Sequence, residues 1–410
     1  MDSKIIGIYS YSTSTPGFNG TIKNDPESFT VEEIPGRISE NENGKYTILK
    51  IRLYNWDTNK FLVHLANLLH ISNKRISYAG TKDKIGITTQ YFCINMPPGM
   101  NVNNINIKDA TVLSVFKSDK MLRLGDLDGN KFTIKIQADG DYSELIQKTY
   151  DEIAYNGGFP NFYGYQRFGS IRINTHRIGK LLLENKYEDA VKLYLYDPEF
   201  DKEDYRKHFG ETGDAAIAMK EYPEYLSFER SLLGYILKKK KYDGAFEVFP
   251  KNLSMLFIHA YQSYLFNRIL SERMLRGRNM YEIFEGDLAY PVDKYFNADK
   301  RDAISANAYN LDKLNKLSSE GKIRPIIPLP GYDTVLSTGI EGEIERNIID
   351  MEGITLNDFK LQNSKLGSSG DYRIISAMPL DFEISEINTV KFSLGKGIYA
   401  TSLIREFLKN

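Results

Sequence analysis

Strand-like segments lie near both ends of this chain, and a mainly helical stretch separates them. The segments 46–54 (YTILKIRLY) and 131–137 (KFTIKIQ) alternate apolar and polar residues, which is typical of strands with one buried face. From about residue 180 to residue 285 the apolar spacing becomes helical, and strand-like runs return after residue 372. We therefore expect an α+β fold, in which a mixed or antiparallel sheet domain is discontinuous in sequence and interrupted by a second domain.

Two helices are predicted within the N-terminal part of the chain. Apolar residues at helical spacing indicate one helix over 58–72. A second helix is predicted over 141–158, where Asp141 and Glu144 have the spacing of a capping box and two glycines end the apolar pattern.

The length of the chain and one linker-like segment suggest where the domains divide. The chain has 410 residues, which is too long for one typical domain. The segment 364–372 (SKLGSSGDY) contains the glycine and serine residues of a linker. We predict a sheet domain formed by 1–184 and 366–410, with an inserted domain over 185–365.

The sequence lacks the residues that several classes of function require. The single cysteine, Cys93, excludes an intrachain disulfide and a cysteine-based zinc site, and the five histidines form no HExxH pair. No GxxxxGK[ST] loop is present to hold a nucleotide, and no apolar run approaches the roughly 18 residues of a membrane span. We therefore expect a cytoplasmic protein that uses no metal, no cofactor and no nucleotide.

The charges are segregated along the chain although the net charge is only −1. Four basic residues and no acidic residue lie in 161–180, and further basic clusters lie in 237–244 and 267–279, whereas 188–205 is acidic. One such cluster would be an ordinary solvated helix face. Several clusters together favour a polyanionic partner, such as RNA or DNA, on one face of the molecule.

Asp83 lies between Lys82 and Lys84 in a segment that allows three interpretations. Locally, the residues favour an ordinary turn. The phosphorylated aspartate of the DKTGT type is excluded, because Ile85 stands where that chemistry needs threonine. The third interpretation is an aspartate that acts as nucleophile or base without a cofactor, kept ionised if either lysine turns towards it.

Five segments resemble those of the TruD family of tRNA pseudouridine synthases, in the family's order. The segment around Asp83, GTKDKIGITTQ, is similar to the family's G-x-K-D-x-x-x-x-T-x-Q pattern. The other segments are IKNDPESFTVEEIP (22–35), NFYGYQRFG (161–169), AYQSYLFNRILSER (260–273) and FSLGKGIYATSLIREF (392–407). The chain departs from the family pattern at Tyr163, where phenylalanine is usual, and at Gly395, where proline is usual. The first change keeps a stacking surface, and the second affects only local stiffness.

The resemblance implies a reaction and a set of residues for it. The family isomerises uridine to pseudouridine in tRNA without a metal or cofactor, and the implied substrate is the uridine at position 13, with further positions open. Asp83 would be the essential catalytic residue, acting as nucleophile or base. The residues that match family positions at the substrate are Lys23, Glu27, Phe29, Lys82, Asn161, Tyr163, Arg167 and Phe392.

The resemblance also suggests individual roles. Tyr163 would stack on the flipped uracil, a contact typically worth roughly 1–3 kcal/mol. Asn161 would hydrogen-bond the base or the loop that carries Asp83. Arg167 would meet phosphate, and His176 would face the RNA or act as a hinge. For Phe29 and Phe392, packing in the sheet core is the alternative interpretation.

The family fold agrees with the strand–helix–strand order of the sequence. It has a catalytic domain of the pseudouridine-synthase fold, discontinuous in sequence, with a family-specific α/β domain, the TRUD domain, inserted. The implied partner is tRNA, gripped between the two domains, and we expect a monomer of the archaeal type.

Two other classes of function stay open on the sequence. A non-catalytic tRNA-binding relative or chaperone would share the basic surface, but it would not need Asp83 in an intact motif. A carboxylate-pair hydrolase would use Glu27 or Glu32 as the partner of Asp83.

Overall fold

Strands from both ends of the chain lie in one mixed sheet, the largest in the structure. The computed structural model describes residues 3–410 except 37, 83, 98–101, 103–104 and 362–365. The strands of this sheet are β2 (Phe29–Pro35), β3 (Tyr46–Tyr54), β4 (Ile76–Tyr78), β5 (Ile87–Ile94), β6 (Ala110–Ser118), β7 (Leu127–Lys135), β15 (Leu380–Glu386) and β16 (Thr389–Gly395). Within the described residues their order is β15-β16-β7-β2-β5-β3-β6, with β4 paired to β5.

The C-terminal strands join the N-terminal ones through the pair β16–β7. Val390 lies opposite Ile134, and Phe392 lies opposite Phe132. The strands β2 and β5 run parallel, while β16–β7, β2–β7 and β3–β5 run antiparallel. The helix α11 (Ala400–Leu408) contributes apolar side chains to the same core as β7 and β16. The predicted α+β fold with a discontinuous mixed sheet is therefore confirmed.

The predicted strand and first helix are present, with a difference at the helix end. The strand β3 has the predicted bounds, and its alternating apolar side chains are buried. The helix α1 (Thr58–Leu68) begins after Asp57, whose carboxylate accepts a hydrogen bond from the backbone N–H of Lys60. It ends before the predicted residue 72, because His70 has a φ of 52°, in the left-handed region that cannot continue a helix.

The predicted capping box of the second helix is wrong. The helix α2 spans Ser143–Tyr155, so neither of the two acidic residues stands at the position before its first turn. The Asp141 carboxylate instead accepts a hydrogen bond from the Ser143 N–H at 2.9 Å, and Glu144 forms an ion pair with Lys148 at 2.8 Å. The C-terminal end agrees with the prediction, because Gly157 has a φ of 77° that glycine adopts without strain.

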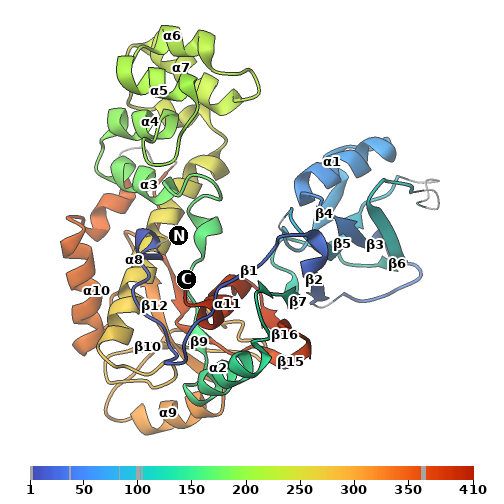
Figure 1. The fold of residues 1–410 in the computed structure, drawn as a ribbon, viewed down its shortest axis with the longest axis vertical. Helices are drawn as coiled ribbons and strands as arrows, with labels where there is room; N and C mark the ends of the chain where they lie inside the picture. Colours follow the sequence, from blue (N-terminus) through green and yellow to red (C-terminus); the bar gives the residue numbers. More distant parts are fainter. Residues whose placement is uncertain (1–2, 37, 83, 98–101, 103–104, 362–365) are drawn as a thin grey trace.

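The middle of the chain forms a helical arm. Its helices are α3 (Thr175–Leu183), α4 (Tyr187–Leu195), α5 (Asp204–Thr212), α6 (Ala215–Glu221), α7 (Ser227–Lys239) and α8 (Lys251–Leu275). Figure 1 shows α4 to α7 at the far end of this arm, while α8 runs back to the centre of the molecule. Apolar side chains from α3 to α8 form one continuous core, to which α10 (Gly339–Met351) adds Ile344, Ile348 and Ile349.

A second sheet lies beyond α8. It contains β10 (Leu288–Pro291), β11 (Ile304–Ser305), β12 (Ile323–Leu329) and β13 (Asp371–Ile374), with α9 (Leu311–Ser319) alongside. Ile374 of β13 lies opposite Ile326 of β12. The segment directly after the predicted boundary at residue 365 therefore pairs with a strand of the predicted insertion.

Short elements connect these layers. They are β1 (Gly20–Thr21), β8 (Gln137–Ala138), β9 (Phe159–Pro160), β14 (Ser376–Ala377) and the 3₁₀ turns η1 (Ser3–Ile6), η2 (Pro26–Ser28), η3 (Asn73–Arg75), η4 (Tyr165–Arg167), η5 (Ala245–Val248) and η6 (Leu356–Lys360). β1 pairs with β8, and β9 pairs with β14. Within the described ranges, no helix is long and apolar enough to cross a membrane.

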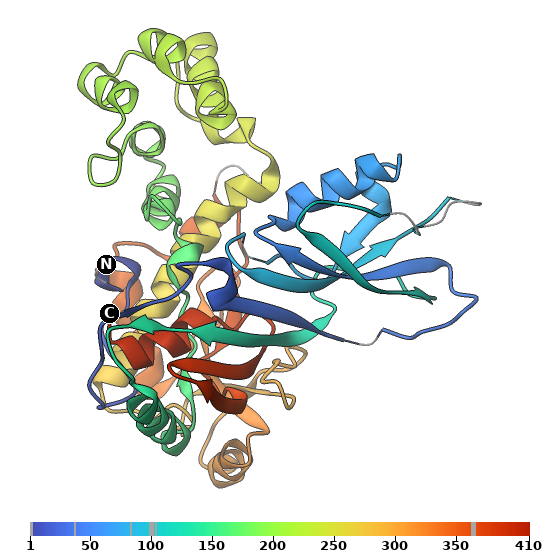
Figure 2. The same cartoon turned by 45° about the vertical axis from the view of Figure 1, so that its right-hand side comes forward.

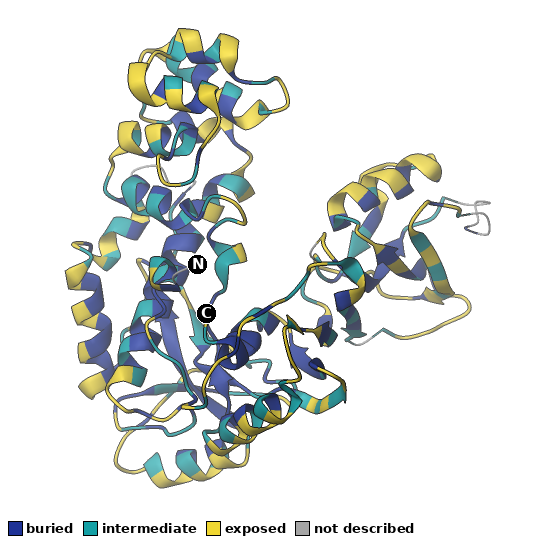
Figure 3. Ribbon diagram, viewed as in Figure 1, coloured by how far each residue is buried: buried dark blue, intermediate teal, exposed yellow. Residues whose placement is uncertain are grey.

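The molecule has two arms that meet at its base. One arm holds α4 to α7, and the other holds α1 with β3, β5 and β6, as the two views in Figures 1 and 2 show. Figure 3 shows that buried residues are concentrated in α8, β12 and the sheet strands, whereas the outer faces of α4 to α7 are exposed. Among the predicted site residues, Phe29 lies on β2, Arg167 on η4 and Phe392 on β16.

Candidate active site

The loop between β4 and β5 is fixed on both sides of residue 83. Asp83 itself lies outside the described residues. Before it, the backbone N–H of Lys82 donates a hydrogen bond to the Thr58 hydroxyl at 3.0 Å. After it, Gly86 has a φ of 136°, and a Cβ there would lie 2.5 Å from the backbone oxygen of Phe29. Gly86 is held by Asn55, whose backbone N–H donates to the Gly86 oxygen at 3.0 Å and whose side-chain oxygen accepts from the Gly86 N–H at 3.3 Å. Residues 82 and 86 are therefore held against α1 and the end of β3.

Lys82 is buried and paired with Glu33. Its Nζ lies 2.8 Å from Glu33 Oε2, and the two side chains are only 5% and 1% exposed. Burial raises the pKa of the Glu33 carboxyl, and the Lys82 ammonium opposes that rise. The described Lys82 side chain therefore points to β2, where it fixes the backbone of the loop, rather than out towards solvent.

A cavity of about 550 Å³ lies beside this loop, and we call it the basic cavity. Residues 79–82 line it together with parts of β2, β7, η4 and 396–401. Its cationic lining residues are Lys23, Lys82, Arg167 and Lys396, and no described lining residue is an aspartate or glutamate. The three cations other than Lys82 also contribute to a positive potential in the cavity.

Aromatic side chains form part of the wall of the basic cavity. Phe29 and Phe132 line it and meet edge to face, with ring centres 6.3 Å apart. The Lys23 ammonium lies 4.3 Å from the Phe29 ring centre, a cation–π contact. Phe392 does not line the cavity: it is 1% exposed and stacks behind Phe132 at 5.4 Å. Of the two alternatives for Phe392, the structure places it in the sheet core.

Asn161 and Tyr163 line a smaller neighbouring pocket of about 240 Å³. This pocket shares Lys396, Gly397 and Ile398 with the basic cavity. Asn161 is buried, and its side-chain amide donates a hydrogen bond to the backbone oxygen of Ile374. The two predicted residues thus lie behind the segment 396–398, not in the wall next to the Asp83 loop.

Two guanidinium groups form cation–π contacts with the ring of Tyr163. Those of Arg373 and Arg167 lie 4.2 and 5.4 Å from its centre, and Tyr163 is only 8% exposed. A base could stack on this ring only if these contacts opened. Arg167 also donates a hydrogen bond from Nε to Ser263 Oγ at 2.9 Å. The stacking of Tyr163 on uracil therefore stays a prediction.

Arg373, on β13, is a residue of the site that the sequence analysis missed. Its guanidinium donates hydrogen bonds to the backbone and side-chain oxygens of Asn161 and, at 2.9 Å, to the backbone oxygen of Gly397. It therefore ties Asn161 and Tyr163 to the segment that borders the basic cavity. An arginine within the apolar strand segment YRIISAM was a possible signal for such a role.

The remaining predicted residues lie outside the cavities. Glu27 is exposed and accepts a hydrogen bond from the Tyr54 hydroxyl, and Glu32 pairs with Lys50 at 2.7 Å. Neither lines the basic cavity, which weakens the idea of a carboxylate-pair hydrolase. Of the two roles predicted for His176, facing RNA is wrong, because the residue is 4% exposed and burial lowers its pKa to about 4, while the hinge role stays a prediction. Among the described residues, no group of three His, Cys, Asp or Glu could hold a metal ion.

A basic cavity with aromatic walls, set between two arms, is typical of enzymes that act on a base taken out of a nucleic-acid helix. The family model "tRNA pseudouridine synthase D (TruD)" matches residues 5–407. The chain belongs to this family of tRNA pseudouridine synthases, which are isomerases. The resemblance found in the five sequence segments is thereby confirmed.

Relatives and a solved structure agree with this assignment over nearly the whole chain. A protein of Picrophilus torridus named "Probable tRNA pseudouridine synthase D" is 50% identical over 406 residues, which covers 98% of this chain and 97% of that protein. A protein of the same name from Thermoplasma volcanium is 50% identical over 93% of this chain and 92% of its own length. A crystal structure of a chain assigned to TruD from Methanosarcina mazei superposes with a TM-score of 0.84 at 36% identity, covering 99% of this chain and 97% of that chain.

Proposed function

We propose that this protein isomerises uridine to pseudouridine in tRNA with Asp83 as its catalytic carboxylate. The observation that carries the proposal is that residues 79–82, directly before Asp83 in the chain, line the basic cavity, with the Lys82 N–H hydrogen-bonded to Thr58. By resemblance the target is the uridine at position 13. We also propose that the protein acts as a cytoplasmic monomer.

The reaction needs no external reagent. The bond between N1 and C1′ breaks, the uracil turns, and C5 bonds to C1′, while the proton that leaves C5 is balanced by one gained at N1. An ionised aspartate can take part by adding to carbon or by removing a ribose proton. The cations Lys23, Arg167 and Lys396 line the cavity, and their positive potential would favour the ionised form of a carboxylate that acts on a substrate there.

The target uridine has to leave its stack before the chemistry begins. Base flipping costs a few kcal/mol, which contacts with the protein must offset. The basic cavity offers Phe29 and Phe132 as apolar walls, and its cations can bind the phosphates on either side of the flipped nucleoside. Asn161, Tyr163 and Arg373 would act as positioning residues, because they hold the segment 396–398 that borders the cavity.

A comparison of Asp83→Asn with the unmodified protein separates an enzyme from a tRNA-binding protein or chaperone. Pseudouridine formation in transcribed tRNA should be lost in Asp83→Asn, while tRNA affinity stays within a few-fold. Asp119→Asn is a matched control, since this exposed aspartate contacts Asn41 and does not line the cavity. Conversion that persists in Asp83→Asn would show that the catalytic assignment is wrong. Absence of conversion by the unmodified protein would refute the activity itself.

A further inference from the structure

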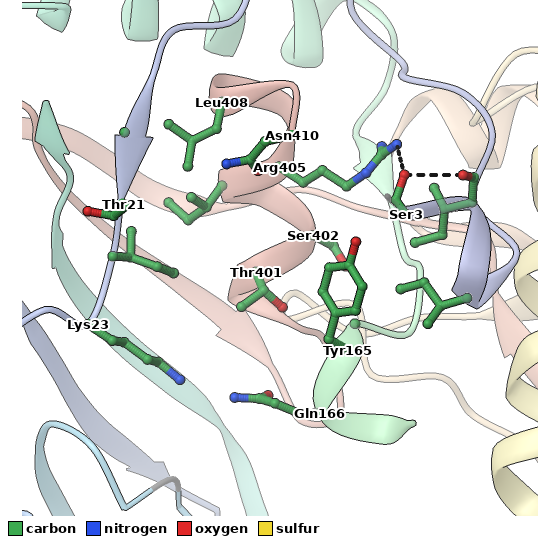
Figure 4. A pocket seen from close by; sticks show the side chains of 16 residues that line it. Ser3, Thr21, Lys23, Tyr165, Gln166, Thr401, Ser402, Arg405, Leu408 and Asn410 are labelled. Carbon is green, nitrogen blue, oxygen red and sulfur yellow. Dashed lines mark hydrogen bonds between the residues drawn. The ribbon is translucent and has the colours of Figure 1, made fainter. Parts of the chain in front are cut away.

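A second pocket adjoins the basic cavity, and we call it the α11 pocket. It has a volume of about 380 Å³ and lies between η1, β1, η4 and α11 (Figure 4). Its apolar lining residues are Ile6, Ile8, Ile22, Ile404 and Leu408, and its polar ones include Ser3, Thr21, Gln166, Thr401 and Ser402. A pocket of this size with apolar walls and a few polar groups can enclose a small planar ligand.

The charge of the α11 pocket suits a polyanion. Lys23 and Arg405 line it, against one terminal carboxylate at Asn410, and none of its described lining residues has an aspartate or glutamate side chain. Arg405 is 9% exposed, and it donates hydrogen bonds to Ser3 Oγ at 3.2 Å and to the backbone oxygen of Ser10 at 2.9 Å. Among the described residues no carboxylate forms an ion pair with it, because Glu406 accepts instead from Ser12 and Thr13.

The two cavities share three lining residues. Lys23, Gln166 and Thr401 line both of them. In Figure 4, Lys23 and Gln166 extend towards each other from opposite sides of the pocket, and Thr401 lies above Gln166 in the first turn of α11. The Thr401 hydroxyl has no hydrogen-bond partner among the described residues, so it is free to bind a ligand from either cavity.

We propose that the α11 pocket holds the base of a nucleotide next to the target uridine in the RNA chain. The inference rests on the proposed function, because it needs the uridine in the basic cavity. Flipping one nucleotide unstacks its neighbour, and enzymes that flip bases commonly contact the flanking nucleotides to choose their substrate. The apolar side chains would cover the faces of this base, the Thr401 hydroxyl would bind its edge, and Lys23 would lie near the phosphate between the two nucleotides.

Two changes test the α11 pocket, one in the RNA and one in the protein. The RNA change is an abasic site at either nucleotide that flanks the converted uridine of tRNA. The protein change is Thr21→Trp, because Thr21 is exposed at the edge of the pocket and an indole there would fill it. Gln137→Trp is the matched control, since Gln137 pairs with Thr21 across β1 and β8, is also exposed, and does not line the pocket.

The expected results are specific for an occupied pocket. For the unmodified protein, one of the two abasic sites should lower kcat/KM roughly ten-fold or more. Thr21→Trp should lower kcat/KM on intact tRNA by a similar factor. On that abasic tRNA, the kcat/KM of Thr21→Trp should equal that of the unmodified protein. Gln137→Trp should have the kcat/KM of the unmodified protein on both RNAs. Equal kcat/KM of the unmodified protein on intact and both abasic tRNAs would overturn the inference. It would also be overturned if the abasic site lowered the kcat/KM of Thr21→Trp by the same factor as that of the unmodified protein. In either case conversion of intact tRNA would leave the proposed function standing.

Discussion

The buried pair Glu33–Lys82 should control both the stability of the protein and the geometry of the Asp83 loop. We consider Glu33→Gln and Lys82→Met, each of which removes one charge of the pair. The two side chains are 1% and 5% exposed, so water cannot readily replace the missing partner. Breaking a buried ion pair in this way typically costs about 3–5 kcal/mol of unfolding free energy.

The double variant separates the pair from its two members. Removal of both charges leaves no uncompensated ion, so the loss of unfolding free energy should be smaller than the sum of the single losses by about 2 kcal/mol. Activity should fall in the single variants, because Lys82 directly precedes Asp83 and a displacement of about 1 Å at a reacting group can cost roughly 100-fold in rate.

Urea unfolding and single-turnover pseudouridine formation measure these effects. Glu32→Gln is the matched control: Glu32 is the neighbouring residue on β2, and its pair with Lys50 is half exposed, so its loss should cost at most about 1 kcal/mol. A double variant whose loss of unfolding free energy equals the sum of the two single losses would refute the coupling. Full activity in Glu33→Gln, with the loop intact, would refute the positioning role of the pair.

Three further predictions concern individual residues. Burial together with neighbouring carboxylates raises the pKa of Glu345 to about 8. The unfolding free energy should therefore fall as pH rises from about 4.5 to 8, because the folded protein then holds a proton that the unfolded chain has lost. Urea titrations at several pH values measure this slope, which Glu345→Gln should flatten. Gly86→Ala should destabilise the protein by roughly 1–3 kcal/mol in urea unfolding, more than Gly125→Ala, where the φ is also positive but no atom lies within 4 Å of the added Cβ. Arg373→Met should lower pseudouridine formation about ten-fold or more with nearly unchanged tRNA affinity measured by filter binding, because it frees Asn161 and the segment before α11.

The local patterns of the sequence predicted local structure well. Alternation at 46–54 predicted β3 because Leu49, Ile51 and Leu53 are buried while Arg52 and Tyr54 are exposed. Helix ends were predicted less well. The capping box at Asp141 failed because the Asp141 carboxylate bonds Ser143 in a turn before the helix, and such competition between local hydrogen bonds is decided by backbone geometry that spacing does not contain.

Tertiary contacts decided the tasks of several site residues. Phe392 and Phe29 match the family pattern equally, yet Phe392 packs behind Phe132 while Phe29 lines the basic cavity. The sequence assigned Tyr163 to stacking on uracil, but in the structure Arg373, more than 200 positions away, lies against its ring. Contacts between residues so distant in sequence depend on the register of paired strands, which composition and periodicity do not encode.

The sequence alone therefore determined the family, the discontinuous sheet and the segment that carries Asp83, because motif order and apolar periodicity are properties of the chain itself. Only the tertiary structure showed that Lys82 forms a buried ion pair with Glu33, that Arg373 lies at the site, and that the α11 pocket lies beside the basic cavity. These features depend on which side chains meet across β2, β13 and α11. Burial then fixes the charge that each partner can carry and the space that is left for a ligand.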